Sequence, residues 1–334
     1  MSSELSPKDF ATSEDVRWCP GCGDYAILKA VQKTLADVGA KPESTAFVSG
    51  IGCAARFPYY VNSYGFHTIH GRAPAVATGL KLANPDLDVW VVTGDGDGLS
   101  IGGNHLMHAL RRNVDLNILL FNNEIYGLTK GQYSPTSRIG TTSPSSPAGS
   151  IDTPVSPGQF VLGAGGRFFA RAIDTDKVGL GHVLEAVHEF KGAGFVEIFQ
   201  NCIVYNQDVF AGFTDRKTAA ETQLRLQHGE PMRFGDGKGI RFNHETYSLD
   251  VVDDNDDVLV HDETNAVIAR LLIDLAAPVA LGVIYRQPAP AFDAAVIEHH
   301  VTGLERTRSV RDFIAGPNPW VVGERETDAA ESEP

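Results

Sequence analysis

Short runs of β-branched and aromatic residues alternate with helix-like amphipathic stretches between residues 45 and 202. This alternation is typical of an α/β fold in which helices cover a doubly wound, mainly parallel sheet. The predicted strands are 45–49, 66–69, 89–93, 117–121, 168–173 and 195–199. The predicted helices are 24–38, 74–83, 102–112 and 177–191.

The chain after residue 202 follows this pattern weakly, with one helix-like stretch at 265–275 and one strand-like stretch at 279–285. Residues 134–158 are rich in Ser, Thr, Pro and Gly, which predicts an irregular loop, and long loops inside compact domains are usually functional. We expect an N-terminal segment (1–16), a main domain (17–210), a C-terminal extension (211–322) and a disordered acidic tail (323–334).

The overall charge makes two classes of partner unfavourable, although local basic patches remain possible. A formal net charge of −14 argues against nucleic acids and anionic membranes as partners, because such a surface repels phosphates. No apolar run approaches the roughly 18 residues that a membrane span needs, and the first residues lack the pattern of a secretory signal. We therefore expect a cytoplasmic protein.

The residues that follow two neighbouring predicted strands suit a hydrated dication. One apolar run ends in GDGDG, which contains Asp95, and the next ends in two asparagines, of which Asn123 is the second. Carboxyl ends of parallel strands meet at one edge of a sheet, so these two side chains should converge. Carboxylate and amide oxygens suit Mg²⁺, and Gly94 and Gly96 would let a diphosphate approach the backbone closely. The alternative is a tight turn and a polar strand cap.

The chain has four cysteines, and each lies where a metal centre could use it. Cys19 and Cys22 form a CxxC pair before a predicted helix, whereas Cys53 follows the first strand and Cys202 follows the last. Four thiolates can hold either structural zinc or a [4Fe–4S] cluster, and this spacing does not decide between them.

Several motifs in order carry a family resemblance. GDG followed 28 residues later by an asparagine resembles the thiamine-diphosphate enzymes. Together with CPGCG, GIGCAARFPYY, HGRAPAVATG and NNEIYGLTKGQYSPTS, it makes residues 17–210 similar to the beta subunits of 2-oxoacid:ferredoxin oxidoreductases. The resemblance implies a thiamine-diphosphate-binding fold whose Mg²⁺ is held by Asp95, Asn123 and the Ile125 carbonyl. It also favours iron–sulfur over zinc, since a redox cluster beside the cofactor can accept electrons.

The resemblance assigns further residues to the site. It implies catalytic roles for Arg56, as a grip on the substrate carboxylate, and for His70; a surface arginine and a plain strand-end histidine are the alternatives. Leu128 and Lys130 resemble positions that line the approach of substrate or coenzyme A (CoA). His105 and His108 are expected to pack beside the diphosphate turn rather than bind metal. The predicted cofactor-binding residues are Gly52, Cys53, His70, Gly94, Asp95, Gly96, Asp97, Asn123, Ile125, Gly127 and Leu128.

The implied reaction is a CoA-dependent oxidative decarboxylation, with 2-oxoglutarate giving succinyl-CoA and CO₂ and electrons passing through the cluster to ferredoxin. Pyruvate is the alternative substrate, and a non-redox thiamine decarboxylase with a structural metal site, or an electron carrier, is the alternative protein. An alpha subunit should supply the glutamate that activates the cofactor, in an (alpha-beta)₂ assembly. Since ferredoxins are typically acidic, their recognition should depend on a local cluster of Lys and Arg near the cysteines.

Overall fold

The structure is a computed structural model that describes residues 5–254, 257–301 and 309–316. The chain divides into two compact units, Met1–Ala295 and Val296–Pro334. All the strands named below belong to the first unit. The predicted acidic tail at 323–334 lies outside the described residues.

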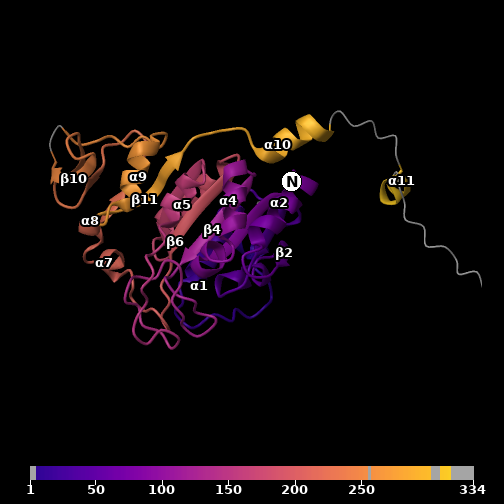
Figure 1. Cartoon of the computed structure of the whole chain (residues 1–334), viewed down its shortest axis with the longest axis horizontal. Helices are drawn as coiled ribbons and strands as arrows, with labels where there is room; N and C mark the ends of the chain where they lie inside the picture. Colours follow the sequence, from indigo (N-terminus) through magenta and orange to yellow (C-terminus); the bar gives the residue numbers. More distant parts are fainter. Residues whose placement is uncertain (1–4, 255–256, 302–308, 317–334) are drawn as a thin grey trace, which may run out of the picture. The chain divides into compact units, whose positions relative to one another are not determined.

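The first unit is built on one large sheet of eight strands (Figure 1). Its spatial order is β2-β1-β3-β4-β6-β5-β11-β7. All neighbouring pairs run parallel except β5 and β11, which are antiparallel. The predicted α/β fold with a mainly parallel sheet is confirmed. The strands are β1 (Thr45–Ser49), β2 (Tyr64–His67), β3 (Asp88–Gly94), β4 (Leu116–Asn122), β5 (Phe168–Ile173), β6 (Ala193–Phe199), β7 (Gln223–Arg225) and β11 (Val279–Arg286).

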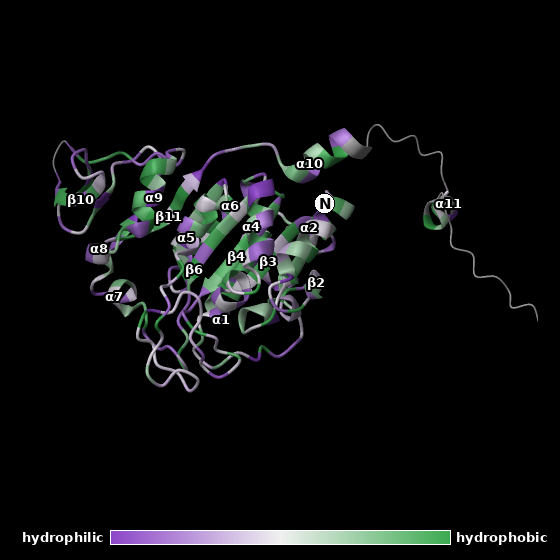
Figure 2. Ribbon diagram, viewed as in Figure 1, coloured by the Kyte–Doolittle hydropathy of each residue, from purple (hydrophilic) through white to green (hydrophobic). Residues whose placement is uncertain are grey.

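Helices cover both faces of this sheet because the central strands are apolar on both sides. Along β3, Val89 and Val91 pack in one core, whereas Trp90 and Val92 pack in the other, as the two-residue period of a strand requires. Figure 2 shows β3 and β4 in the hydrophobic colour at the centre of the sheet. The first core includes α2 (Ala73–Ala83), α4 (Gly103–Arg112), α5 (Pro157–Gly163) and α9 (Ala266–Asp274), and the second includes α1 (Asp24–Asp37) and α6 (Lys177–Glu189).

Part of the chain after residue 210 belongs to the large sheet of the main domain. Its strands β7 and β11 continue the large sheet, and β11 covers the edge of β5 that would otherwise be unpaired. The strands β8 (Arg233–Phe234), β9 (Lys238–Asn243) and β10 (Ser248–Asp253) form a separate antiparallel sheet. Of these strands the sequence predicted only β11; β7, β8, β9 and β10 were not predicted, and the pairing of β11 with β5 was not predicted either. The predicted boundaries at 16, 210 and 322 stay a prediction.

Three short elements differ from the sequence-based expectation. The GDGDG segment forms a helical turn, α3 (Asp95–Leu99), and α5 begins inside the predicted loop. Strand β2 lies two residues earlier than predicted, because its four residues are all exposed and give no burial pattern. The remaining elements are η1 (Pro7–Phe10), η2 (Pro42–Ser44), η3 (Ala54–Tyr59), α7 (Ala211–Thr214), α8 (Ala219–Thr222), α10 (Phe292–Val296), the π-helical turn η4 (Ile297–Val301) and α11 (Val310–Ala315). Within the described ranges, no helix combines the length and apolar character that crossing a membrane requires.

Candidate functional site

Four neighbouring parallel strands each lead to one predicted ligand. β1, β3, β4 and β6 lie side by side, so their carboxyl ends share one edge of the sheet. Asp95 and Asn123 follow β3 and β4 directly, and Cys53 and Cys202 lie a few residues beyond β1 and β6. The predicted convergence at this edge is therefore present in the fold.

A pocket at this edge, here called the Asp95 pocket, collects the predicted cofactor residues. All eleven of them line it, from Gly52 to Leu128. Asp24 and Tyr126 line it as well and were not predicted. The pocket encloses only about 40 Å³, whereas pockets for small ligands usually measure a few hundred. This chain alone therefore holds only part of a ligand of cofactor size.

Asp95 is a buried carboxylate that accepts hydrogen bonds from two side chains. It is 2% exposed, and burial raises its pKa to about 6. Ser134 Oγ and Thr136 Oγ1 donate hydrogen bonds to Oδ2, the latter over 2.7 Å. The backbone N–H groups of Gly96 and Asp95 also hydrogen-bond to this carboxylate. A cation at Oδ1 would offset the cost of burying this charge.

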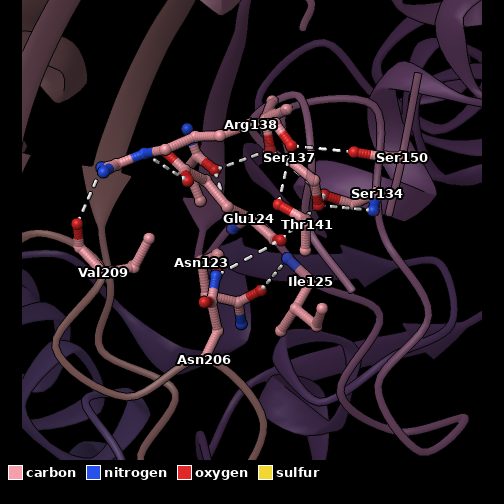
Figure 3. A network of polar contacts seen from close by, with 12 residues as sticks. Asn123, Glu124, Ile125, Ser134, Ser137, Arg138, Thr141, Ser150, Asn206 and Val209 are labelled. Atoms are coloured by element: carbon pink, nitrogen blue, oxygen red, sulfur yellow. Dashed lines mark hydrogen bonds and ion pairs between the residues drawn. The ribbon is translucent and has the colours of Figure 1, made fainter. Parts of the chain in front are cut away.

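The turn after β4 contains Asn123 and Ile125, which both line the same pocket. Asn123 Oδ1 accepts a hydrogen bond of 3.2 Å from the backbone N–H of Ile125, and Asn206 Nδ2 donates to the Asn123 carbonyl over 2.9 Å. Glu124, which lies between Asn123 and Ile125, has a φ of 55°, a left-handed conformation that non-glycine residues rarely adopt. Figure 3 shows how Ser137 and Arg138 hold this turn: Ser137 Oγ donates to the Glu124 carbonyl, and Arg138 pairs with the Glu124 carboxylate at 3.1 Å.

Asp97 holds the walls of the pocket together. Its Oδ1 accepts hydrogen bonds from the backbone N–H groups of Ile51 (3.1 Å) and Gly71 (2.8 Å), and its Oδ2 accepts one from Thr93 Oγ1 (2.8 Å). His70 Nδ1 lies 3.1 Å from the same Oδ1, which fixes the ring beside the pocket. The geometry gives Asp97 a positioning role, because these contacts occupy both of its oxygens.

A turn brings the CxxC cysteines together. The N–H of Cys22 donates to the Cys19 carbonyl over 3.0 Å, and Gly21 between them has a φ of +87°. Proline followed by a glycine of positive φ is the signature of a type II turn, which explains CPGC at this point. Trp18 anchors the segment, since its indole Nε1 donates to the Cys53 carbonyl over 2.7 Å.

All four cysteines line a single cavity of about 210 Å³, here called the thiol cavity. Burial raises the pKa of Cys53 to about 12 and also raises that of Cys22, and the neighbouring thiols contribute to both shifts. Among the described residues, no group of three or more His, Cys, Asp or Glu side chains is placed to hold a metal ion. Arg56 lines the thiol cavity rather than the Asp95 pocket.

The two hollows adjoin. Cys53, Asn123, Gly127 and Leu128 line both of them. A Cβ placed on Gly127 would lie 3.5 Å from the sulfur of Cys53 and 3.7 Å from that of Cys202. Gly127, which has no side chain, therefore forms part of the wall shared by the Asp95 pocket and the thiol cavity.

A buried polar chain crosses the sheet to Asp95. Arg171 on β5 donates to Glu197 on β6 over 2.7 Å, and Asn122 at the end of β4 donates to the same carboxylate over 2.8 Å. The Thr136 hydroxyl lies 3.0 Å from Asn122 Oδ1 and shares its proton between that oxygen and Asp95. Removing one partner of a buried ion pair typically lowers the stability of a protein by about 3–5 kcal/mol. This series of hydrogen bonds therefore holds its side chains firmly in place.

Sequence reasoning missed the residues that orient the predicted ligands. Ser134 and Thr136 lie in the loop whose composition marked it as functional, but nothing local showed that they reach Asp95. Gln200 contacts Asn123, which is 77 positions away in the sequence, and no motif predicted this contact. His105 contacts Arg72, and the buried Nδ1 of His108 has no hydrogen-bond partner among the residues that the structure describes. Leu128 is 45% exposed in the shared wall, and Lys130 lines the thiol cavity.

Comparison with known proteins identifies the family. The model of the C-terminal TPP-binding domain of thiamine pyrophosphate enzymes matches residues 50–198, which confirms the predicted thiamine-diphosphate-binding fold. The 2-oxoglutarate oxidoreductase subunit KorB of Mycobacterium tuberculosis is 45% identical over 330 residues, covering 94% of this chain and 88% of that protein. The chain belongs to the beta subunits of the 2-oxoacid:ferredoxin oxidoreductases.

This beta subunit is also similar to more distant members. The 2-oxoglutarate synthase subunit KorB of Methanothermobacter marburgensis is 43% identical over 188 residues, covering 56% of this chain and 66% of that protein. The 2-oxoglutarate:ferredoxin oxidoreductase of Magnetococcus marinus, solved with 2-oxoglutarate, coenzyme A and succinyl-CoA bound, has a chain with a TM-score of 0.76 and 33% identity. The match covers 94% of this beta subunit and 96% of that chain, so it includes the part after residue 210.

Proposed function

We propose that this beta subunit, together with an alpha subunit, catalyses the CoA-dependent oxidation of 2-oxoglutarate to succinyl-CoA and CO₂ and passes the electrons to ferredoxin. The observation that carries this proposal is the shared wall between the Asp95 pocket and the thiol cavity. A decarboxylating cofactor and an electron acceptor must lie close together in such a reaction. The relatives named above support 2-oxoglutarate as the substrate.

The oxygens of the Asp95 pocket fit Mg²⁺ and a diphosphate. Asp95 Oδ1, Asn123 Oδ1 and the Ile125 carbonyl combine one charge with two neutral oxygens, and Mg²⁺ usually completes such a set with phosphate oxygens and water. Gly96 contributes through its size, since a Cβ there would lie 2.2 Å from the Tyr126 ring. Bound thiamine diphosphate supplies the electron sink for loss of CO₂.

The thiol cavity fits a [4Fe–4S] cluster better than a structural zinc. Its volume of about 210 Å³ far exceeds that of one ion, and its four cysteines supply a complete ligand set. A structural zinc would also have no reason to border the cofactor pocket. Cys22, Cys53 and Cys202 are half-buried, and iron provides the cationic partner that offsets the charge of thiolates in such a place.

Two polar side chains are assigned to the substrate and cofactor. His70 faces the Asp95 pocket, with Nδ1 held by Asp97, so that Nε2 is oriented for a cofactor contact. Arg56 donates to the Arg17 carbonyl over 2.9 Å through Nη1, which leaves the rest of its guanidinium for a substrate carboxylate. Leu128 and Lys130 follow the shared wall and would border the path of substrate or CoA.

An alpha subunit is needed to complete the site. The enclosed volume of the Asp95 pocket is a small fraction of what thiamine diphosphate occupies, so a second surface must cover the cofactor. We assign to that subunit the glutamate that activates the aminopyrimidine ring, within an (alpha-beta)₂ assembly. Purified without its partner, the chain should not decarboxylate 2-oxoacids.

A spectrum of the co-expressed complex tests the function directly. We expect a broad brown absorbance that bleaches on addition of 2-oxoglutarate plus CoA, because electrons from the substrate reduce the cluster. Pyruvate plus CoA should bleach it much more slowly, and 2-oxoglutarate without CoA should not sustain turnover. A colourless complex that still releases CO₂ would support the non-redox alternative instead. Faster bleaching with pyruvate would reassign the substrate.

Lysines beside the cysteines are the surface we assign to ferredoxin. Lys29, Lys33 and Lys177 line a hollow of about 650 Å³ that Cys22 also borders. Changing Lys29 and Lys177 to glutamate should lower the rate of ferredoxin reduction roughly tenfold at low salt, because charge complementarity accelerates association. Reduction of a neutral dye should not change. The matched control is Lys41→Glu with Lys191→Glu, which lie before β1 and β6 at the opposite edge of the sheet. A rate that is insensitive to both salt and the first pair contradicts the assignment.

A further inference from the structure

Gln200 lies where the two centres meet. It follows the last residue of β6 and precedes Cys202 by two positions. Its side chain is 1% exposed and lines the thiol cavity, and its backbone N–H donates to the Asn122 carbonyl over 2.9 Å. A buried amide is costly unless each of its polar atoms has a partner, so its contacts are informative.

The hydrogen bonds fix the orientation of the Asn123 amide and, through it, that of the Gln200 amide. The backbone N–H of Ile125 can only donate, so the Asn123 atom that faces it is Oδ1. Asn123 Nδ2 therefore faces Gln200, where it donates to Oε1 over 2.7 Å. The NH₂ group of Gln200 is left to donate to Cys22 Sγ over 3.2 Å and to the Asn201 carbonyl over 2.9 Å. Each amide thus has one consistent orientation.

We infer that Gln200 is a positioning residue that links the magnesium-binding amide of Asn123 to the Cys22 ligand of the cluster. Its oxygen holds Asn123 with Oδ1 toward the cation. Its N–H stabilises the sulfur of Cys22, and such bonds favour the reduced cluster, which carries more negative charge. This inference rests on the proposed function, since it requires both centres.

Two variants separate the two halves of the link. In the holo complex with its partner subunit, Gln200→Met loses both contacts, so Mg²⁺-dependent thiamine-diphosphate affinity should fall about 10–100-fold, as for other residues that orient metal ligands. The reduction potential of its cluster should also become more negative. Gln200→Glu keeps an acceptor for Asn123 but loses the donor to Cys22, so its affinity should be retained while its potential falls.

Calorimetric titration gives the affinity, and a redox titration followed by electron paramagnetic resonance gives the potential. Gln223→Met is the matched control: Gln223 is 7% exposed on β7, donates to the Phe213 carbonyl over 2.7 Å and accepts from Arg225 over 2.9 Å. It should change neither quantity. Equal shifts in this control would show general loosening and overturn the inference.

The remaining outcomes are also decisive. If either quantity stays at the wild-type value in Gln200→Met, the link is refuted. If Gln200→Glu loses affinity as Gln200→Met does, the assigned orientation of the amide is wrong. Iron analysis of the wild-type complex distinguishes these failures from failure of the function: protein without iron refutes the proposed cluster, whereas iron-replete protein with unchanged potentials refutes only the role of Gln200.

Discussion

Replacing Asp95 with asparagine should weaken Mg²⁺-dependent binding of thiamine diphosphate by more than about 100-fold, since even residues that only orient a metal ligand are worth 10–100-fold. The substitution keeps the size of the side chain and an oxygen for the hydroxyl donors at Oδ2. It removes the anionic member of the proposed ligand set. The loss would therefore report on charge and not on packing.

The same variant should fold as well as the wild type without cofactor, because a neutral amide is easier to bury than a carboxylate. Calorimetric titration of the complex and thermal unfolding of the cofactor-free protein measure the two effects. Asp293→Asn is the control, since Asp293 is 5% exposed and accepts from the backbone N–H of Asp115 at the opposite edge of the sheet. Wild-type affinity in Asp95→Asn would remove the basis for the magnesium site.

Cys202→Ala should reduce the iron content of the complex to near background and abolish electron transfer to ferredoxin, yet leave thiamine-diphosphate binding close to normal. Cys202 lines the thiol cavity and not the Asp95 pocket, which makes this separation possible. Alanine is preferred to serine because a hydroxyl could still ligate iron. Iron and sulfide analysis, visible absorbance and cofactor titration provide the measurements.

Val204→Ala is the matched control, since Val204 lines the same cavity, is 52% exposed and carries no thiol. It should keep its iron. If Cys202→Ala also keeps the iron and the brown absorbance, the four-cysteine ligand set is wrong. If it loses zinc instead of iron, the structural-metal alternative holds.

The sequence predicted the central sheet well because its signals are local. The apolar runs that become β1, β3, β4, β5 and β6 are buried on both faces, so each stands out from its neighbours, and the predicted bounds of β1 and β5 match the structure. Strand order then followed from the parallel crossover, which placed Asp95 beside Asn123. The edge strand β2 gave a weaker signal because none of its residues is buried.

The residues that orient the ligands could not be predicted in this way. Thr136 meets Asp95 across 41 positions of sequence, and Gln200 meets Cys22 across 178. Such contacts exist only once the loop and the strand ends are folded together, so no spacing in the chain encodes them. Arg171 shows the same limit, since a lone arginine in a strand gives no sign of the buried Glu197 that it pairs with.

The position of Gly127 in the shared wall also limits how the proposed cofactor site and cluster site can be altered separately. Gly127 lines both the Asp95 pocket and the thiol cavity, and a Cβ on it would lie 3.5 Å from the sulfur of Cys53 and 3.7 Å from that of Cys202. With the proposed cluster and cofactor in the two hollows, an electron passing between them there needs no intermediate aromatic carrier, and a side chain larger than alanine at residue 127 would crowd both groups. Tuning one partner of this pair without disturbing the other must therefore be done from the outer sides of the two hollows.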